Sequence, residues 1–221
     1  MIKPEFVTFT GLDASTDLDR VEDLSKRYPI EWGVLFSPNR QGKEPSYPSF
    51  EAISLIVERK ALRLAAHICG GHARAVMDNV IPDVIAETVA YFERFQINVF
   101  DDRVGSTDHQ LLFHTLVRDI SNGTKSIIFQ ARDPVAFPAA TDVSWLYDQS
   151  GGNGVVPQSW PPHPGRLVGY AGGINPDNAA EIMFAVGTAG PYWLDMQHGV
   201  RTNDLLDLDR CEAVCKVLWE A

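Results

Sequence analysis

The sequence predicts a single domain, spanning residues 1–221, that folds as a (β/α)8 barrel, also called a TIM barrel. Eight short segments rich in β-branched and aromatic residues recur along the chain, and segments with helical spacing of apolar residues separate most of them. Strands that alternate with helices pair in parallel. The 221 residues leave about 28 for each of eight strand–helix units, which is near the lower size limit of such a barrel.

The eight expected strands share short runs of Val, Ile, Phe, Tyr and Trp side chains. They are residues 5–10, 30–37, 62–69, 95–100, 126–131, 143–148, 167–172 and 192–196.

Apolar residues at three- and four-residue spacing predict the helices between these strands. Expected helices cover residues 18–24, 50–57, 84–92, 111–116 and 205–218, and one more begins at Pro176. The expected caps are, in chain order, Asp13, Ser15 or Thr16, then Ser49, then Asn175, then Asn203 or Asp204. In the last helix, the residues expected to face inward are Leu205, Leu208, Cys211, Cys215 and Leu218. Residues 132–142 are too short and too rich in proline for a full helix.

Composition excludes several classes of protein. With 29 acidic and 19 basic residues the net charge is −10, which has the wrong sign for a protein that binds a nucleic acid or an anionic membrane. No apolar stretch approaches the roughly 18 residues of a membrane span, and the first residues lack the apolar core of a signal peptide. The 3 cysteines form no disulfide framework. We therefore expect a cytoplasmic protein.

Two long loops follow the second and sixth expected strands, at residues 37–49 and 149–166. Loops in these positions emerge at the C-terminal face of a barrel, where such barrels place their chemistry. Both loops are candidate lids.

Two glycine turns predict a phosphate site at the same face. Gly172 and Gly173 lie between the seventh strand and a capped helix, and Gly199 follows the eighth strand. Glycine lets backbone N–H groups approach an anion, and a helix N-terminus adds about half a positive charge. Loops seven and eight together form the phosphate site common in this fold. We therefore expect a small-molecule sugar phosphate as the ligand.

These motifs resemble those of the phosphoribosylanthranilate isomerase family. The similarity covers about residues 143–218, where the family has an Asp-ended sixth strand, a GGTG loop, an AGGL-x-P-x-N stretch and a final DVSSGVE. The corresponding segments here are Asp148, residues 151–154, residues 171–178 and residues 195–201. The resemblance implies a cofactor-free Amadori rearrangement of an N-linked phosphoribosyl amine. It also implies a phosphate site formed by Gly152, Gly154, Gly172, Gly173, Gln197, His198 and Gly199.

The resemblance further implies an acid and a base. Asp148 matches the family's acid, and a barrel mouth closed by a lid would raise its pKa enough to hold a proton near neutrality. Thr10 occupies the position of the family's catalytic Cys, but a threonine hydroxyl does not ionise near neutral pH. The base is therefore displaced, and Cys69 and His67, which face the same way at the end of the third strand, are the two replacements.

The family also holds the anthranilate carboxylate with an Arg in the loop after strand two. Arg40 is our choice for this role, with Lys43 as an alternative and Arg132 as a further cation near the same mouth. His198 replaces a serine of the family motif and would add a donor to the phosphate. No segment has metal-ligand spacing, so we expect no metal.

Three functions remain open after these observations. The first is an isomerase of the phosphoribosylanthranilate type with an altered base. The second is an epimerase or lyase that acts on another sugar phosphate, and the third is a non-catalytic binder of a phosphate ligand. The sequence leaves open whether the protein is a monomer or a homodimer.

Overall fold

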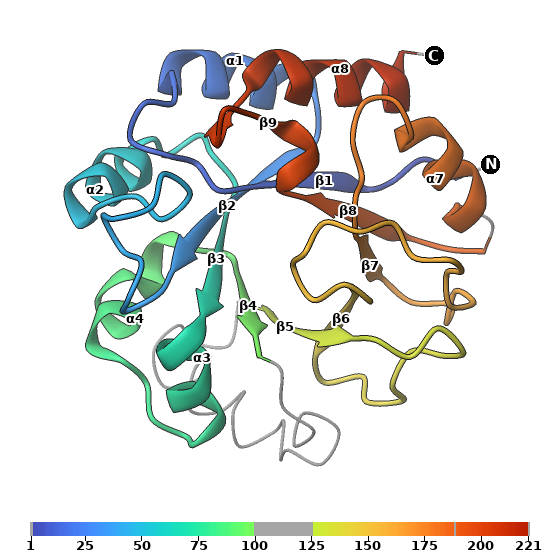
Figure 1. Cartoon of the computed structure of the whole chain (residues 1–221), viewed down its shortest axis with the longest axis horizontal. Helices are drawn as coiled ribbons and strands as arrows, with labels where there is room; N and C mark the ends of the chain where they lie inside the picture. Colours follow the sequence, from blue (N-terminus) through green and yellow to red (C-terminus); the bar gives the residue numbers. More distant parts are fainter. Residues whose placement is uncertain (1, 100–125, 188, 221) are drawn as a thin grey trace.

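The computed structural model is a closed barrel of eight parallel strands, which confirms the predicted fold class. It describes every residue except 1, 100–125, 188 and 221. Each strand pairs with its neighbours in chain order, and β8 closes the ring against β1 (Figure 1). The strands are β1 Phe6–Thr10, β2 Ile30–Phe36, β3 Leu64–Cys69, β4 Arg94–Asn98, β5 Ser126–Ala131, β6 Ser144–Tyr147, β7 Val168–Ala171 and β8 Tyr192–Met196. Their bounds differ from the predicted ones by two residues at most.

Helices cover the outside of the barrel (Figure 1). The described ones are α1 Leu18–Arg27, α2 Phe50–Glu58, α3 Gly70–Met77, α4 Asp83–Thr88, α7 Ala179–Val186 and α8 Leu208–Trp219. Short 3-10 turns, η1 Val89–Tyr91 and η4 His198–Val200, follow α4 and β8, and the hairpin β9 Arg201–Thr202 with β10 Leu205–Leu206 precedes α8. The helix predicted at 111–116 lies outside the described residues. No helix among those described is long and apolar enough to cross a membrane.

Several predicted helix ends are wrong. Asp17, which accepts the N–H groups of residues 19 and 20, caps α1 in place of the three earlier candidates. Asp207 caps α8, while Asn203 and Asp204 form a tight turn with φ of 52° and 62°. Leu205 therefore lies on β10 and is exposed.

Two further differences concern glycine and asparagine. The helix α3, which begins directly after β3, was not predicted because its first residues are Gly70 and Gly71, which are typical of a turn. The helix expected at Pro176 begins three residues later, at Ala179. Asn175 forms a turn instead, in which its side chain accepts the N–H of Asp177. The predicted cap Ser49 and the absence of a helix at 132–142 are confirmed.

The interior of the barrel is unusually polar below its mouth. Apolar side chains of the main core, such as Phe9, Trp32 and Phe129, lie between the strands and the helices. Inside the barrel, a small apolar cluster that includes Phe6 and Trp193 is accompanied by buried polar residues. The buried polar and charged residues of the strands are Thr8, Thr10, Glu31, His67, Arg94, Gln96 and Asp195. Such residues need partners or a function, since burying an unpaired polar group is costly.

Candidate active site

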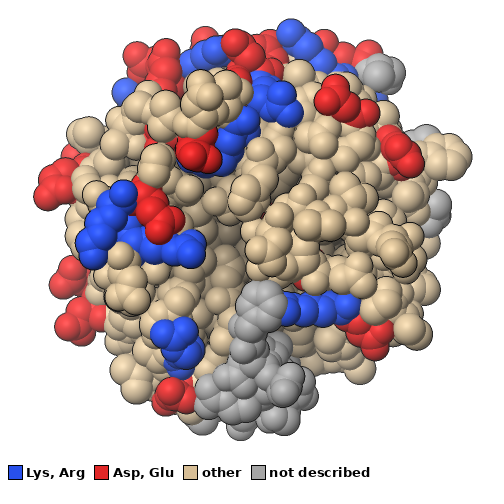
Figure 2. Space-filling view, in the orientation of Figure 1, with Lys and Arg blue, Asp and Glu red and all other residues tan. Residues whose placement is uncertain are grey.

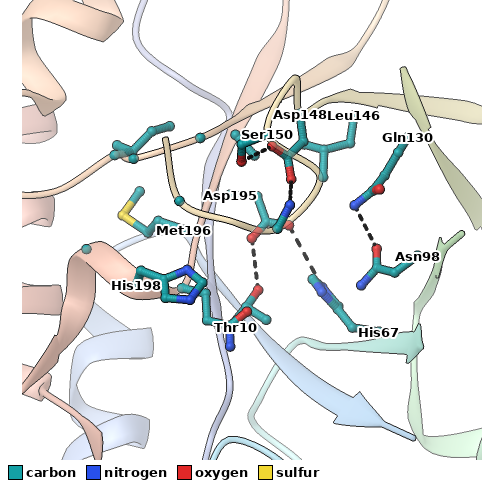
Figure 3. Close-up of a pocket in the computed structure, with 18 of the residues that line it drawn as sticks. Thr10, His67, Asn98, Gln130, Leu146, Asp148, Ser150, Asp195, Met196 and His198 are labelled. Carbon is teal, nitrogen blue, oxygen red and sulfur yellow. Dashed lines mark hydrogen bonds and ion pairs between the residues drawn. The ribbon is translucent and has the colours of Figure 1, made fainter. Parts of the chain in front are cut away.

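A cavity of about 70 Å³ lies at the carboxyl ends of the strands, in the position where this fold places its chemistry (Figure 3). The strands contribute its floor and the loops after β6, β7 and β8 contribute one wall. Its residues are Thr10, His67, Gln96, Asn98, Gln130, Leu146, Asp148, Ser150, Gly152, Gly154, Ala171, Gly172, Gly173, Ile174, Asp195, Met196, Gln197, His198 and Gly199. The structure therefore brings most of the predicted site residues together.

Asp195, near the end of β8, is the most perturbed acid in this cavity. Asp195 is 5% exposed, and its Oδ1 accepts a hydrogen bond of 2.9 Å from the Thr10 hydroxyl. Its Oδ2 is buried without a hydrogen-bond donor among the described residues. Burial raises the pKa of Asp195 to about 7, although the Thr10 hydrogen bond opposes the shift. A carboxyl group with this pKa exchanges a proton readily at neutral pH.

His67 faces Asp195 across the floor of the cavity. Its Nε2 lies 4.0 Å from Oδ2 of Asp195, and its Nδ1 lies 3.2 Å from the side-chain amide nitrogen of Gln96. Because that amide donates, Nδ1 accepts and the ring proton resides on Nε2, which points toward Asp195. Burial lowers the pKa of His67 to about 3, and the charge of Arg94 acts in the same direction. At neutral pH the pair is therefore a neutral imidazole that faces a carboxyl group, and the contact is not an ion pair.

Gly33 of β2 makes room for Thr10 and His67, the two groups that face Asp195. A Cβ atom at Gly33 would lie 2.7 Å from the Thr10 hydroxyl and 2.9 Å from Nε2 of His67. Any larger residue would therefore displace one of the two groups that face Asp195.

Side-chain amides line the cavity next to His67. Oδ1 of Asn98 accepts hydrogen bonds from the amides of Gln96, at 3.0 Å, and Gln130, at 3.1 Å. The Asn98 amide in turn lies 3.3 Å from Sγ of Cys69. The network fixes the orientation of Gln96 and, through it, that of the His67 ring.

Asp148, the predicted acid, lines the same cavity directly after β6 (Figure 3). Its Oδ1 accepts hydrogen bonds from the Ser150 hydroxyl, at 2.8 Å, and the Gly151 N–H, at 3.1 Å, while Oδ2 accepts the Gly152 N–H at 2.6 Å. All three partners donate, and all three belong to the loop that follows β6. This geometry is that of an acceptor that holds the glycine-rich loop.

The loops after β6, β7 and β8 meet at one wall of the cavity, as the glycine turns predict. A Cβ atom at Gly199 would lie 1.8 Å from the carbonyl oxygen of Ile174, and one at Gly173 would lie 2.7 Å from the backbone nitrogen of Val156. Only glycine fits such close approaches between backbones. Gly173 also has a φ of 63°, in the left-handed region.

Several backbone N–H groups at this wall are available to an anion. Those of Gly154 and Gly173 donate to no carbonyl group within the described residues. The Gly173 carbonyl accepts the side-chain amides of Asn175 and Asn178, which turns the N–H of Ile174 in the opposite direction. The N–H of Gly152, by contrast, is already bound to Asp148, so it is not one of the free donors.

A second cavity, of about 260 Å³, adjoins the first and contains two of the other predicted residues, Arg40 and Cys69. The two cavities share Asn98, Gln130, Gly152, Gln197 and His198. The Arg40 guanidinium donates to the Tyr47 hydroxyl at 3.0 Å, and its side chain remains 54% exposed. Arg132 lines neither cavity.

Cys69 is separated from the acidic groups. The prediction that it faces the same way as His67 holds only in part, because Cys69 ends β3 and lines the second cavity, whereas His67 lines the first. Burial raises the pKa of the Cys69 thiol. A thiol with a raised pKa is a poor base, so His67 and Thr10 are the predicted residues that the structure places beside a reactive group.

Asp195 was not predicted as a functional residue. It is the first residue of the motif at 195–201, and its position two residues after Trp193 gives the inward alternation of a strand. The amides of Gln96, Asn98 and Gln130 were also missed, and their signal is the same: polar residues at alternate positions near the ends of strands. Among the described residues, no group of three or more His, Cys, Asp or Glu side chains is placed to hold a metal ion.

Charged side chains are unevenly distributed around the mouth of the barrel. Charged side chains of both signs lie around the rim, whereas the surface over the loops after β6 and β7 is largely uncharged (Figure 2). The glycine wall, which is formed by Gly154, Gly173 and Gly199, carries backbone N–H groups, and the residues that line this cavity include no lysine or arginine.

The sequence matches no protein-family model and no curated protein at a significant level. Solved structures show the same fold. Phosphoribosyl anthranilate isomerase from Thermotoga maritima has 14% identity and a TM-score of 0.63, with 100% of both chains covered. N-(5′-phosphoribosyl)anthranilate isomerase from Pyrococcus furiosus has 15% identity and a TM-score of 0.59, with 98% of this chain and 99% of that chain covered. A mutant tryptophan synthase α-subunit from Pyrococcus furiosus has 10% identity and a TM-score of 0.53, with 100% of both chains covered. At these identities the similarity shows the fold alone.

Proposed function

We propose that this chain is an enzyme that isomerises a small sugar phosphate by proton transfer, in the manner of an Amadori rearrangement. The observation that carries the proposal is the position of Asp195. This buried carboxyl group, whose pKa is raised to about 7, lies in a cavity with one wall formed by glycine turns suited to a phosphate.

Asp195 supplies the acid and the base in this proposal. Protonated Asp195 gives its proton to the ring oxygen of an N-linked phosphoribosyl amine, and the C1–O bond breaks as the nitrogen lone pair forms a C=N bond. The resulting carboxylate then takes the proton from C2, which leaves an enol amine that becomes the 1-amino ketose. One carboxyl group is regenerated in each cycle. Thr10 orients the carboxyl group of Asp195 by binding Oδ1, and the Nε2–H of His67 faces Oδ2, the oxygen that carries the proton.

Asp148 remains the alternative acid, as the sequence resemblance implies. It lines the same cavity, but each of its oxygens already accepts a hydrogen bond from the loop. We therefore assign it to holding the loop that closes over the phosphate.

The size of the cavities supports a ligand that spans both. About 70 Å³ is room for a phosphate group or a few waters, whose share of liquid volume is about 30 Å³ each. A sugar phosphate with a second substituent needs the adjoining cavity, where Arg40 would meet an acidic substituent. One solved structure with this fold contains reduced 1-(o-carboxyphenylamino)-1-deoxyribulose 5-phosphate, a ligand with a phosphate at one end and a carboxylate at the other.

The direct test is turnover of N-(5′-phosphoribosyl)anthranilate, followed by the loss of its fluorescence. We expect activity in the unmodified protein, a loss of kcat of about 10³-fold in Asp195→Asn, and a smaller loss in Asp148→Asn with a larger effect on KM. Equal loss of kcat in Asp148→Asn, with Asp195→Asn still active, would transfer the acid–base role to Asp148. Growth without tryptophan of a strain that lacks the isomerase, when given this gene, is the complementary test.

A second candidate is an epimerase or lyase that acts on another sugar phosphate. The observation that favours it is Thr10, which binds Asp195 and cannot itself serve as the base. In that case the fluorescence assay shows no turnover, but ribose 5-phosphate binds and solvent deuterium enters a sugar phosphate. Binding without exchange or turnover of any sugar phosphate would indicate a non-catalytic phosphate binder.

A further inference from the structure

A buried ion pair lies inside the barrel below the candidate active site. Nη1 of Arg94 lies 3.0 Å from Oε1 of Glu31, and the same oxygen accepts the Thr8 hydroxyl at 2.8 Å. Glu31 and Arg94 are 0% and 5% exposed, so the pair is removed from solvent. Neither residue lines the active-site cavity.

The pair belongs to the layer directly below Asp195. The Arg94 guanidinium lies over the ring of Trp193, 4.1 Å from its centroid, and Trp193 precedes Asp195 by two residues on β8. Glu31 similarly precedes Gly33, which adjoins Thr10 and His67, by two residues on β2. Two residues of a strand span about 6.6 Å, so charges in one layer act strongly on the layer above.

Unpartnered polar atoms connect the two layers. Nη2 of Arg94 and Oδ2 of Asp195 are both buried without a hydrogen-bond partner among the described residues. In a stable core such atoms are rare, and here one lies in each of the two neighbouring layers.

We propose that Glu31 and Arg94 are positioning residues that set the proton affinity of Asp195 from within the barrel, without touching the substrate. The proposal rests on the role of Asp195 in the proposed function. Its consequence is that the two members of the pair act in opposite directions, since the carboxylate of Glu31 repels an ionised Asp195 and the guanidinium of Arg94 stabilises it.

The other groups that face Asp195 are accounted for. Thr10 of β1 donates to it, the neutral ring of His67 of β3 lies 4.0 Å away, and Asp148 after β6 repels its ionised form. From β7, its partner in the strand register is the uncharged Ala171. Arg94 also lowers the pKa of His67, but burial is the larger cause of that shift, so the ring stays neutral where Asp195 titrates. Arg63, whose Nε lies 3.3 Å from Oε2 of Glu31, is present in every variant.

The test measures the titration of Asp195 by ¹³C NMR of the carboxyl groups of labelled aspartates, with Asp195→Asn identifying the resonance. We expect Glu31→Gln to lower the titration midpoint and Arg94→Met to raise it, each by about 0.5–1 pH unit. The double variant E31Q/R94M should lie between the two. Glu87→Gln, at an exposed residue of α4 on the outside of the barrel, removes the same charge away from the pair; it is the control and should leave the midpoint unchanged.

Shifts of the same sign in both single variants, or no shift in folded protein, would overturn the proposal, because mere loosening of the core does not give opposite signs. If Arg94→Met does not fold, Glu31→Gln and the double variant decide: the first must lower the midpoint and the second must lower it less. The NMR titration needs no substrate. Failure of the proposed function therefore appears as absent turnover with the shifts intact, whereas failure of this inference appears as turnover with an unshifted pH profile.

Discussion

The Thr10 hydroxyl donates a hydrogen bond of 2.9 Å to Oδ1 of Asp195, joining residues that are 185 positions apart in the chain. The bond crosses the seam where β1 closes on β8, and the register there pairs Thr8 with Asp195. Only one oxygen of the carboxyl group is held in this way, while the other faces His67. The result is an oriented carboxyl group whose second oxygen has no hydrogen-bond partner among the described residues, and this is the oxygen to which the proposed function assigns proton transfer.

This bond predicts the effect of Thr10→Val on pH dependence. The hydroxyl lowers the pKa of Asp195, so its removal should raise that pKa above about 7 and move the basic half of the reaction's pH profile to higher pH. Thr10→Ser, which keeps the hydroxyl, is the matched control and should keep the original profile. The pH dependence of kcat/KM measures the effect, and a profile that moves equally in both variants would show that the methyl group, not the hydrogen bond, matters.

Asp195 also predicts how stability depends on pH. Its pKa in the folded state is about 7, above the value of about 3.9 expected in the unfolded chain, so the folded state retains the proton between these values. Stability is therefore lost as pH rises through this window. Asp195→Asn removes this loss. On going from pH 5 to pH 8, the free energy of unfolding of the variant should therefore rise by about 2–3 kcal/mol relative to that of the unmodified protein.

Urea unfolding of both proteins at pH 5 and at pH 8 measures this gain. The change in the free energy of unfolding between the two pH values is determined for each protein, and the two changes are compared. His67 has a pKa lowered to about 3, so it binds fewer protons in the folded state and its contribution to stability falls as pH drops from about 6.5 toward 3. That contribution is present in both proteins and cancels in the comparison. An Asp195→Asn variant that gains nothing on going from pH 5 to pH 8 would contradict a raised pKa at this residue.

The sequence was sufficient for the strands and for the meeting of the glycine loops. Residues such as Ile30, Trp32 and Val34 have few alternatives to a buried strand, and Gly173 and Gly199 are needed where backbones nearly touch. Helix ends were less predictable, because Asp17 and Asp207 compete with nearby residues that are equally good caps.

The sequence predicts where the candidate site lies, but it does not predict which aspartate has the perturbed pKa. Asp148 and Asp195 are both aspartates near strand ends, and only the structure shows that one is satisfied by three donors while the other has a free, buried oxygen. Burial, which raises the pKa of Asp195, depends on side chains from distant strands. Spacing along the chain does not reveal it.

The glycine wall predicts a specific effect of Gly173→Ala on phosphate binding. A methyl group there would lie 2.7 Å from the backbone nitrogen of Val156 and would separate the loops after β6 and β7, which moves the free N–H groups apart. We expect affinity for ribose 5-phosphate to fall at least tenfold, since a hydrogen bond to a charged group contributes about 1.5–3 kcal/mol. Gly165→Ala is the matched control, because Gly165 also has a positive φ, 78°, but has no atom within 4 Å of the added carbon. Both variants carry similar backbone strain, so calorimetric titration that shows equal loss of affinity in the two would remove the phosphate site from this wall.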